Sequence, residues 1–135
     1  MLTACGGGSG GDKSATATLA VLETTDLHFN IRSYDYFKLA DDPSYGFERT
    51  ATLIRKARSE FANTLLVDNG DTIQGTALAD YEAQVAPIAC EQQLSMYKAM
   101  GVLQFDAGTL GNHEFNYGLP FLNQVLGGGL KVDGV

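Results

Sequence analysis

Three short apolar runs alternate with longer amphipathic segments along this chain. The first two runs, residues 18–22 and 65–67, are rich in β-branched and aliphatic side chains, and residues 102–107 lead to a third predicted strand. Apolar runs of this length are typical of buried strands. We therefore predict buried strands at the first two runs and a third strand where residues 102–107 end.

Segments with helical periodicity lie between and after the predicted strands. Between residues 46 and 61, apolar side chains recur every three or four positions and charged side chains take the other face, which predicts an amphipathic helix. Residues 86–101 predict a second helix, with Pro87 in its first turn and Gly101 at its end. Residues 119–126 predict a last short helix.

Two connecting segments carry weaker signals. Residues 72–79 predict the start of a short helix, and residues 30–45, with several aromatic side chains and a turn at Asp41-Asp42-Pro43, predict an irregular loop. The chain thus alternates strand, helix, strand, helix, strand, helix. This βαβαβ order predicts an α/β fold with a parallel sheet covered by helices.

A loop with residue types that can bind metal ions follows each of the three predicted strands. The three loops contain Asp26-Leu27-His28, Gly70-Asp71 and Gly111-Asn112-His113-Glu114-Phe115. Ligands of open parallel sheets gather at the carboxyl ends of the strands, so we expect these loops to form one site. Taken singly, each loop has a plainer interpretation as a capped turn, because Asp, Asn and Gly are ordinary turn residues.

The donor set suits transition metals. We expect Asp26, His28, Asp71 and Asn112 to be ligands, with Asp26 and His28 on one side of an extended chain and Asp71 between two ions. Two metals about 3.5–4 Å apart can bind a phosphate and activate water for in-line displacement. His113 would then act as general acid on the leaving oxygen, against the alternative of a structural histidine.

Composition narrows the choice of partners. The 135 residues are 44% hydrophobic and 19% charged, which is typical of a globular domain, and the net charge of −7 argues against binding to nucleic-acid polymers. An acidic protein that handles phosphate needs bound cations to offset repulsion. No apolar stretch approaches the roughly 20 residues that span a bilayer.

Residues 1–17 differ from the rest of the chain. Gly6–Gly11 predicts a flexible linker, and Leu2–Cys5 resembles a bacterial lipobox, in which Cys5 would carry the lipid anchor. Only four residues precede Cys5, so the sequence as written would not be exported. The alternative is a disordered tail. We expect Cys90 to be a small core residue, and a disulfide between Cys5 and Cys90 is disfavoured.

The three loops together resemble the motifs of a known family. Asp26-Leu27-His28 resembles D-x-H, Gly70–Gly75 is similar to G-D-x-x-Q-G, and Gly111–Phe115 matches G-N-H-E-F of calcineurin-like metallophosphoesterases in the 5′-nucleotidase group. Residues 67–71 and 111–119 look most like the periplasmic 2′,3′-cyclic-nucleotide 2′-phosphodiesterase/3′-nucleotidases. Asn116 supports that branch, because 5′-nucleotidases usually carry Asp there.

The resemblance implies a fold, a reaction and cofactors. It implies that residues 18–135 are the N-terminal portion of a metallophosphatase sandwich that binds two divalent ions of the Zn, Mn or Co type. The implied reaction takes 2′,3′-cyclic nucleotides to 3′-nucleotides and then to nucleoside and phosphate. The implied location is the periplasm or cell envelope of a bacterium, as a lipoprotein, if a signal peptide exists upstream. A 5′-nucleotidase or UDP-sugar hydrolase, and a non-catalytic lipoprotein binding module, are the alternatives. The family adds further histidines downstream, so we expect this chain alone to bind metal weakly and to have little activity.

Overall fold

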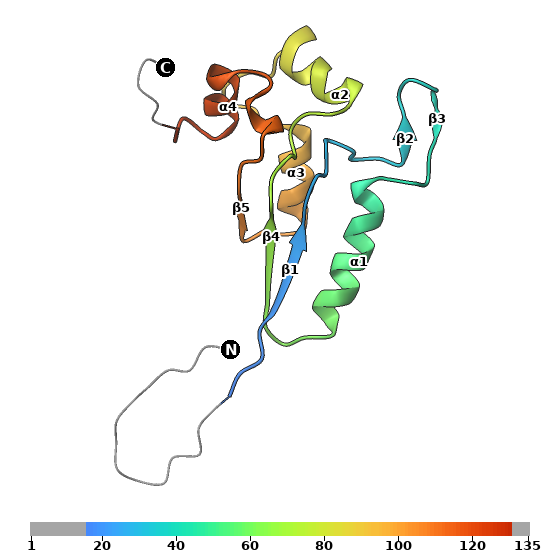
Figure 1. Cartoon of the computed structure of the whole chain (residues 1–135), viewed down its shortest axis with the longest axis vertical. Coiled ribbons are helices and arrows are strands. Elements are labelled where there is room, and N and C mark those ends of the chain that lie inside the picture. The colour runs from blue at the N-terminus through green and yellow to red at the C-terminus, as the bar shows by residue number, and fades with distance from the viewer. Residues whose placement is uncertain (1–15, 131–135) are drawn as a thin grey trace.

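A computed structural model describes residues 16–130 of the chain. It shows a three-stranded sheet, a separate two-stranded hairpin and helices at one face and one end of the sheet (Figure 1). In chain order the elements are β1 (Ala20–Thr24), β2 (Tyr34–Asp35), β3 (Ala40–Asp41), α1 (Phe47–Ser59), β4 (Thr64–Asp68), α2 (Ala77–Asp80), the π-helix η1 (Tyr81–Val85), α3 (Ser95–Val102), β5 (Ala107–Gly108), the 3₁₀-helix η2 (His113–Phe115) and α4 (Leu119–Val125).

The sheet is parallel, in the order β1-β4-β5. Thr24 pairs with Asp68, and Asp68 pairs with Gly108, so the three strands end side by side. The loops that follow them therefore leave the sheet at the same edge. The predicted α/β fold with a parallel sheet is confirmed, and with it the prediction that the three motif loops start at one place.

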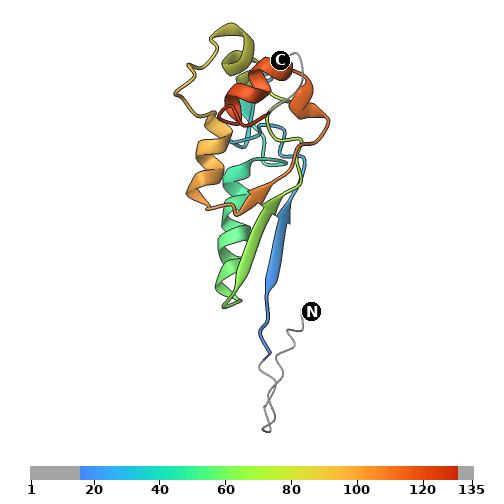
Figure 2. The ribbon, with the colours of Figure 1, turned by 90° about the vertical axis from the view of Figure 1, so that its left-hand side faces the viewer.

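Helices α1 and α3 pack on one face of the sheet, and Figure 2 shows no described helix on the opposite face. The covered face holds the core, where Leu66 is fully buried between strand and helices. On the opposite face Val21 is 60% exposed. The strand predicted at residues 18–22 is therefore displaced to β1 and buried on one side only. Its sequence resembles a fully buried strand because its apolar run reaches both faces.

Two predicted helices form as expected and one does not. Helices α1 and α4 match the predicted segments 46–61 and 119–126. The helix predicted over residues 86–101 begins only at Ser95. Pro87 forces the preceding residue out of the helical region, and Ala86 has φ −131°. Cys90 lies in the resulting irregular stretch and is exposed, so the prediction of a core residue was wrong.

The connecting segments are more ordered than their sequences indicate. Residues 30–45 contain the antiparallel β2–β3 pair and not only an irregular loop, with the Tyr34 and Tyr36 rings 5.2 Å apart in an edge-to-face contact. In the segment 72–79 the helix begins at Ala77, where the Thr76 hydroxyl accepts a hydrogen bond from the Ala79 N–H at 3.2 Å. Thr72 and Ile73, before the helix, lie in a loop whose backbone amides donate to the Glu114 carboxylate.

Three predictions about the start of the chain stay predictions. Lipid attachment at Cys5 and the flexible linker fall on residues 1–15, outside the described range, and the domain boundary between residues 17 and 18 is not tested. Within the described part of the chain, none of the helices has the length and apolar character needed to cross a bilayer.

Candidate metal centre

The loops after β1 and β4 run side by side because backbone hydrogen bonds continue beyond the strands. The amide of Asp26 donates to the Gly70 carbonyl at 3.1 Å, that of His28 to the Asp71 carbonyl at 2.9 Å, and that of Phe29 to the Thr72 carbonyl at 2.9 Å. These bonds hold the first two motifs in a fixed relation to each other.

The two loops turn sharply through left-handed backbone conformations. Asp26, His28 and Asp71 have φ of 53°, 46° and 57°. The prediction that Asp26 and His28 share one side of an extended chain is therefore wrong about the backbone. Each such residue costs about 1–3 kcal/mol, and it persists only where its surroundings hold it. Here the inter-loop hydrogen bonds do so.

Side chains from all three loops nevertheless converge. Donor atoms of His28, Asp71 and His113 all lie within 4.8 Å of one another. Asp26 joins them, with its Oδ1 3.5 Å from Nε2 of His28. The His28 and His113 rings stand edge to face with centroids 5.0 Å apart. The tertiary fold thus brings together four of the five predicted site residues.

The fifth predicted residue, Asn112, lies directly before His113 at the start of η2. Its side chain is exposed, and within residues 16–130 it makes no hydrogen bond. The structure therefore places Asn112 in the predicted loop, with its side chain exposed beside His113. Its role as a ligand stays a prediction.

A hydrogen bond orients the imidazole of His28 so that one of its ring nitrogens can bind a cation. Its Nδ1 lies 3.0 Å from the carbonyl oxygen of Gln74. A carbonyl can only accept, so Nδ1 is the donor in this hydrogen bond, and Nε2, on the side of Asp26, is the nitrogen left to bind a cation. Metal-binding histidines are commonly oriented by a hydrogen bond of this kind.

His113 is held at two points. Its backbone N–H donates to Oδ1 of Asp71 at 2.8 Å, which joins the second and third loops. The Asn116 amide nitrogen lies 2.8 Å from Nδ1 of His113 and also donates to Gln74 at 3.4 Å. An amide nitrogen can only donate, so Nδ1 is unprotonated and the ring proton lies on Nε2.

Two buried carboxylates, Asp68 and Glu114, support the site, and neither was predicted from the sequence to have a role there. Asp68 is 3% exposed and accepts hydrogen bonds from the hydroxyls of Thr24 and Thr72 and from the Gly70 amide. Glu114 is 1% exposed and accepts only from backbone amides. The only sequence signal was that each residue lies within or beside a motif.

The charges at this edge of the sheet fit a cation. Asp26, Asp71 and Glu114 lie on the converging loops and Asp68 ends β4, and in the described part of the chain no Lys or Arg forms an ion pair with any of the four. Imidazole and carboxylate donors together suit divalent transition metals. A bound divalent ion would supply the positive charge that the protein itself does not place there.

The sequence profile of the calcineurin-like phosphoesterases matches residues 19–131, which include every element of this site. The chain belongs to the calcineurin-like phosphoesterase family. Members of this family use divalent metal ions, which agrees with the donors gathered here.

Individual relatives support the same assignment. The chain is 49% identical to a 2′,3′-cyclic-nucleotide 2′-phosphodiesterase/3′-nucleotidase of Yersinia enterocolitica, over 86% of this chain and 18% of that protein. It is 36% identical to a snake venom 5′-nucleotidase of Naja atra, over 79% of this chain and 20% of that protein. The crystal structure of the calcineurin-like phosphoesterase YfkN from Bacillus subtilis superposes with a TM-score of 0.77 and 46% identity, covering 82% of this chain and 34% of that one. The chain thus spans about a fifth of these curated relatives.

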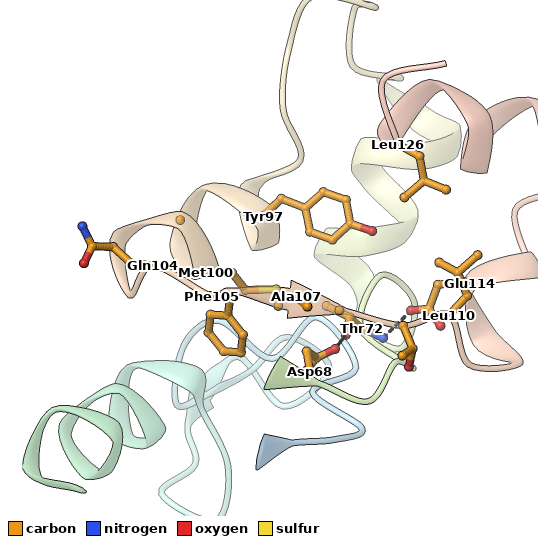
Figure 3. Close-up of a pocket in the computed structure, with 13 residues that line it drawn as sticks. Asp68, Thr72, Tyr97, Met100, Gln104, Phe105, Ala107, Leu110, Glu114 and Leu126 are labelled. Carbon is orange, nitrogen blue, oxygen red and sulfur yellow. Dashed lines mark hydrogen bonds between the residues drawn. The ribbon is translucent and has the colours of Figure 1, made fainter. Parts of the chain in front are cut away.

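A cavity of about 460 Å³ lies beside β5 in this phosphoesterase chain (Figure 3). Asp68, Thr72 and Glu114 line it on the side of the site, and Tyr97 and Leu126 line it from the helices. Burial, followed by the charges of Glu114 and Asp68, raises the pKa of Tyr97 to about 12. The phenol therefore stays neutral at physiological pH.

Tyr97 should limit stability at alkaline pH. Its pKa is higher in the folded chain than the value of about 10 expected when unfolded. The neutral form thus favours folding below pH 10, and that contribution is lost as pH rises toward 12, by at most about 2.7 kcal/mol. We expect Tyr97→Phe to flatten the fall in unfolding free energy between pH 10 and 12, measured by urea denaturation. Tyr81→Phe, at an exposed position, is the control, and equal slopes for Tyr97→Phe and wild type would contradict the assignment.

Proposed function

We propose that this chain forms the metal-binding part of a nucleotide phosphohydrolase that opens 2′,3′-cyclic nucleotides to 3′-nucleotides and then releases phosphate. The observation that carries the proposal is the convergence of His28, Asp71 and His113 donor atoms within 4.8 Å. Among relatives, the identity of 49% to a cyclic-nucleotide phosphodiesterase exceeds the 36% to a 5′-nucleotidase, which supports this branch.

The chain offers residues for both metal binding and proton transfer. Asp26, His28, Asp71 and Asn112 would hold divalent ions, which offset phosphate charge and acidify a water nucleophile when bound. His113 carries its ring proton on Nε2, since Nδ1 accepts from Asn116. To act as general acid the ring would also hold a proton on Nδ1, donated to the Asn116 side-chain oxygen once that amide has turned over. The Nε2 proton would then pass to the leaving oxygen of the phosphate ester and leave a neutral imidazole. Asn116 keeps the ring oriented without adding the negative charge that a carboxylate would bring.

A chimera can test the proposal. In it, residues 19–131 replace the matching segment of the Yersinia relative, and turnover is measured with Mn²⁺ on 2′,3′-cyclic AMP, 3′-AMP and 5′-AMP. We expect turnover of the first two substrates, and we expect His113→Ala to lower kcat by about 10²–10⁴-fold. Tyr81→Phe, remote from the loops, should leave turnover unchanged.

Other outcomes would favour the alternatives. Preference for 5′-AMP over 3′-AMP would indicate the 5′-nucleotidase branch, for which the Naja relative is the supporting observation. Turnover that does not change in His113→Ala would contradict the proposed role of this residue. The 135-residue chain by itself should hydrolyse bis-p-nitrophenyl phosphate far more slowly than the chimera, and equal rates would contradict the expectation that this chain binds metal weakly.

A further inference from the structure

Among the described residues, Glu114 is the only one whose carboxylate accepts hydrogen bonds from four backbone amides. Its carboxylate is 1% exposed and accepts hydrogen bonds from four backbone amides on two different loops. Oε2 accepts from Asp71 at 2.8 Å and Gly111 at 2.6 Å, and Oε1 accepts from Thr72 at 2.5 Å and Ile73 at 3.3 Å. The Glu114 carboxylate and its four amide donors thus join the second and third motif loops directly.

The three successive amides of residues 71–73 form a nest, a concavity that binds anions. The left-handed conformation of Asp71, with φ 57°, turns these N–H groups inward. In this chain the nest is filled by the carboxylate of Glu114 and is closed to a substrate phosphate. The Asp71 side chain meets the third loop, where its Oδ1 accepts a hydrogen bond from the His113 backbone amide at 2.8 Å.

We propose that Glu114 is a positioning residue for the metal centre, and that its carboxylate clamps the Asp71 loop to the His113 loop before any metal arrives. It would act through Asp71 and His113, without touching metal or substrate. The inference rests on the proposed function, because it assumes that Asp71 and its neighbours hold a divalent ion. It adds that the spacing of these donors depends on a residue outside the donor set.

Substitution by glutamine tests the clamp with almost no change of shape. Each carboxylate oxygen receives two N–H groups, so the amide nitrogen of Glu114→Gln would face two donors whichever way it turned. We expect the Co²⁺ affinity of the 135-residue chain, measured by calorimetry, to fall about 10–100-fold. We also expect the visible absorption spectrum of bound Co²⁺ to change, because the donors are displaced.

Glu114→Asp separates geometry from charge. Aspartate keeps the negative charge and both oxygens but is one methylene shorter, so it cannot span the two loops. We expect it to lose as much Co²⁺ affinity as Glu114→Gln. Wild-type affinity in Glu114→Asp would show that charge alone matters and would overturn the clamp.

Glu82→Gln is the matched structural control. The Glu82 carboxylate also accepts a backbone amide, that of Ser95 at 3.0 Å, but at the start of α3 and away from the motif loops. Its loss should lower the melting temperature and leave Co²⁺ affinity unchanged. An equal loss of affinity in Glu82→Gln and Glu114→Gln would reduce the effect to general destabilisation and would overturn the proposal.

Amide hydrogen exchange on the metal-free wild type tests the clamp without relying on a variant that folds. We expect the amides of residues 71–73 and 111 to be protected, and at least tenfold less so in Glu114→Gln. Unprotected amides in the metal-free wild type would overturn the clamp. If these amides are protected but the wild-type chain binds no Co²⁺, the metal site and the proposed function would be contradicted. The role of Glu114 toward a metal would then be contradicted as well.

Discussion

Gly111→Ala should destabilise the fold by about 2–4 kcal/mol, a large loss for a single methyl group. A Cβ at residue 111 would lie 2.2 Å from Oδ1 of Asp71 and 2.8 Å from the Asp71 backbone nitrogen. The backbone of Asp71 cannot move away from the new methyl group, because it is hydrogen-bonded to the His28 amide and to the Glu114 carboxylate. The loss should appear as a fall in melting temperature on the order of 10 °C.

The control for this prediction is Gly101→Ala. Gly101 lies within α3, and its Cβ would meet nothing within 4 Å. Alanine is the better helix former, so this change should stabilise the chain by up to about 1 kcal/mol. The two substitutions are chemically identical and should have opposite signs. A melting temperature for Gly111→Ala within a degree of wild type would mean that the second and third loops are not in contact.

Asp71→Asn should remove the response to metal while the metal-free fold persists. Asparagine can still accept the His113 amide through its side-chain oxygen, so the loop contact survives. It lacks the negative charge of the Asp71 carboxylate, which has an oxygen within 4.8 Å of donor atoms of His28 and His113. We expect Mn²⁺ affinity to fall by more than about 100-fold, beyond the 10–100-fold typical of residues that only orient a ligand.

The rise in melting temperature on adding Mn²⁺ measures the effect of Asp71→Asn on metal binding directly. Mn²⁺ at about 100 times its dissociation constant should stabilise the wild-type chain by roughly 2.7 kcal/mol, because it binds only the folded state. Asp71→Asn at the same Mn²⁺ concentration should melt as it does without metal. Asp41→Asn, which removes an exposed carboxylate on β3, should keep the full shift. A full shift in Asp71→Asn would place the ion elsewhere.

The alternation of strands and helices was readable in the sequence because it depends on local periodicity. The stripe of α1 and the apolar run of β4 each indicated their element, and the order of the elements implied a parallel sheet. From that sheet it followed that the loops carrying Asp26, Asp71 and His113 would meet at one edge. The structure agrees with this reasoning.

The errors arose where local patterns were outweighed by other interactions. Residues 86–94 have helical periodicity, but Pro87 and the Glu82 cap on Ser95 move the start of α3 to residue 95. Asp26 and His28 were placed on an extended chain, yet both occupy left-handed turns fixed by hydrogen bonds to the neighbouring loop. No sequence window contains both partners of such bonds.

By itself, the sequence determined the class of fold, the chemistry of the donors and the family, since composition, periodicity and motifs are properties of nearby residues. Only the tertiary structure decided how those donors face each other. It buried Glu114 between two loops separated by about 40 residues in sequence, and it set the protonated nitrogens of His28 and His113 through Gln74 and Asn116. These contacts are long-range or depend on chain reversal, so they exist only once the sheet has brought the strand ends together.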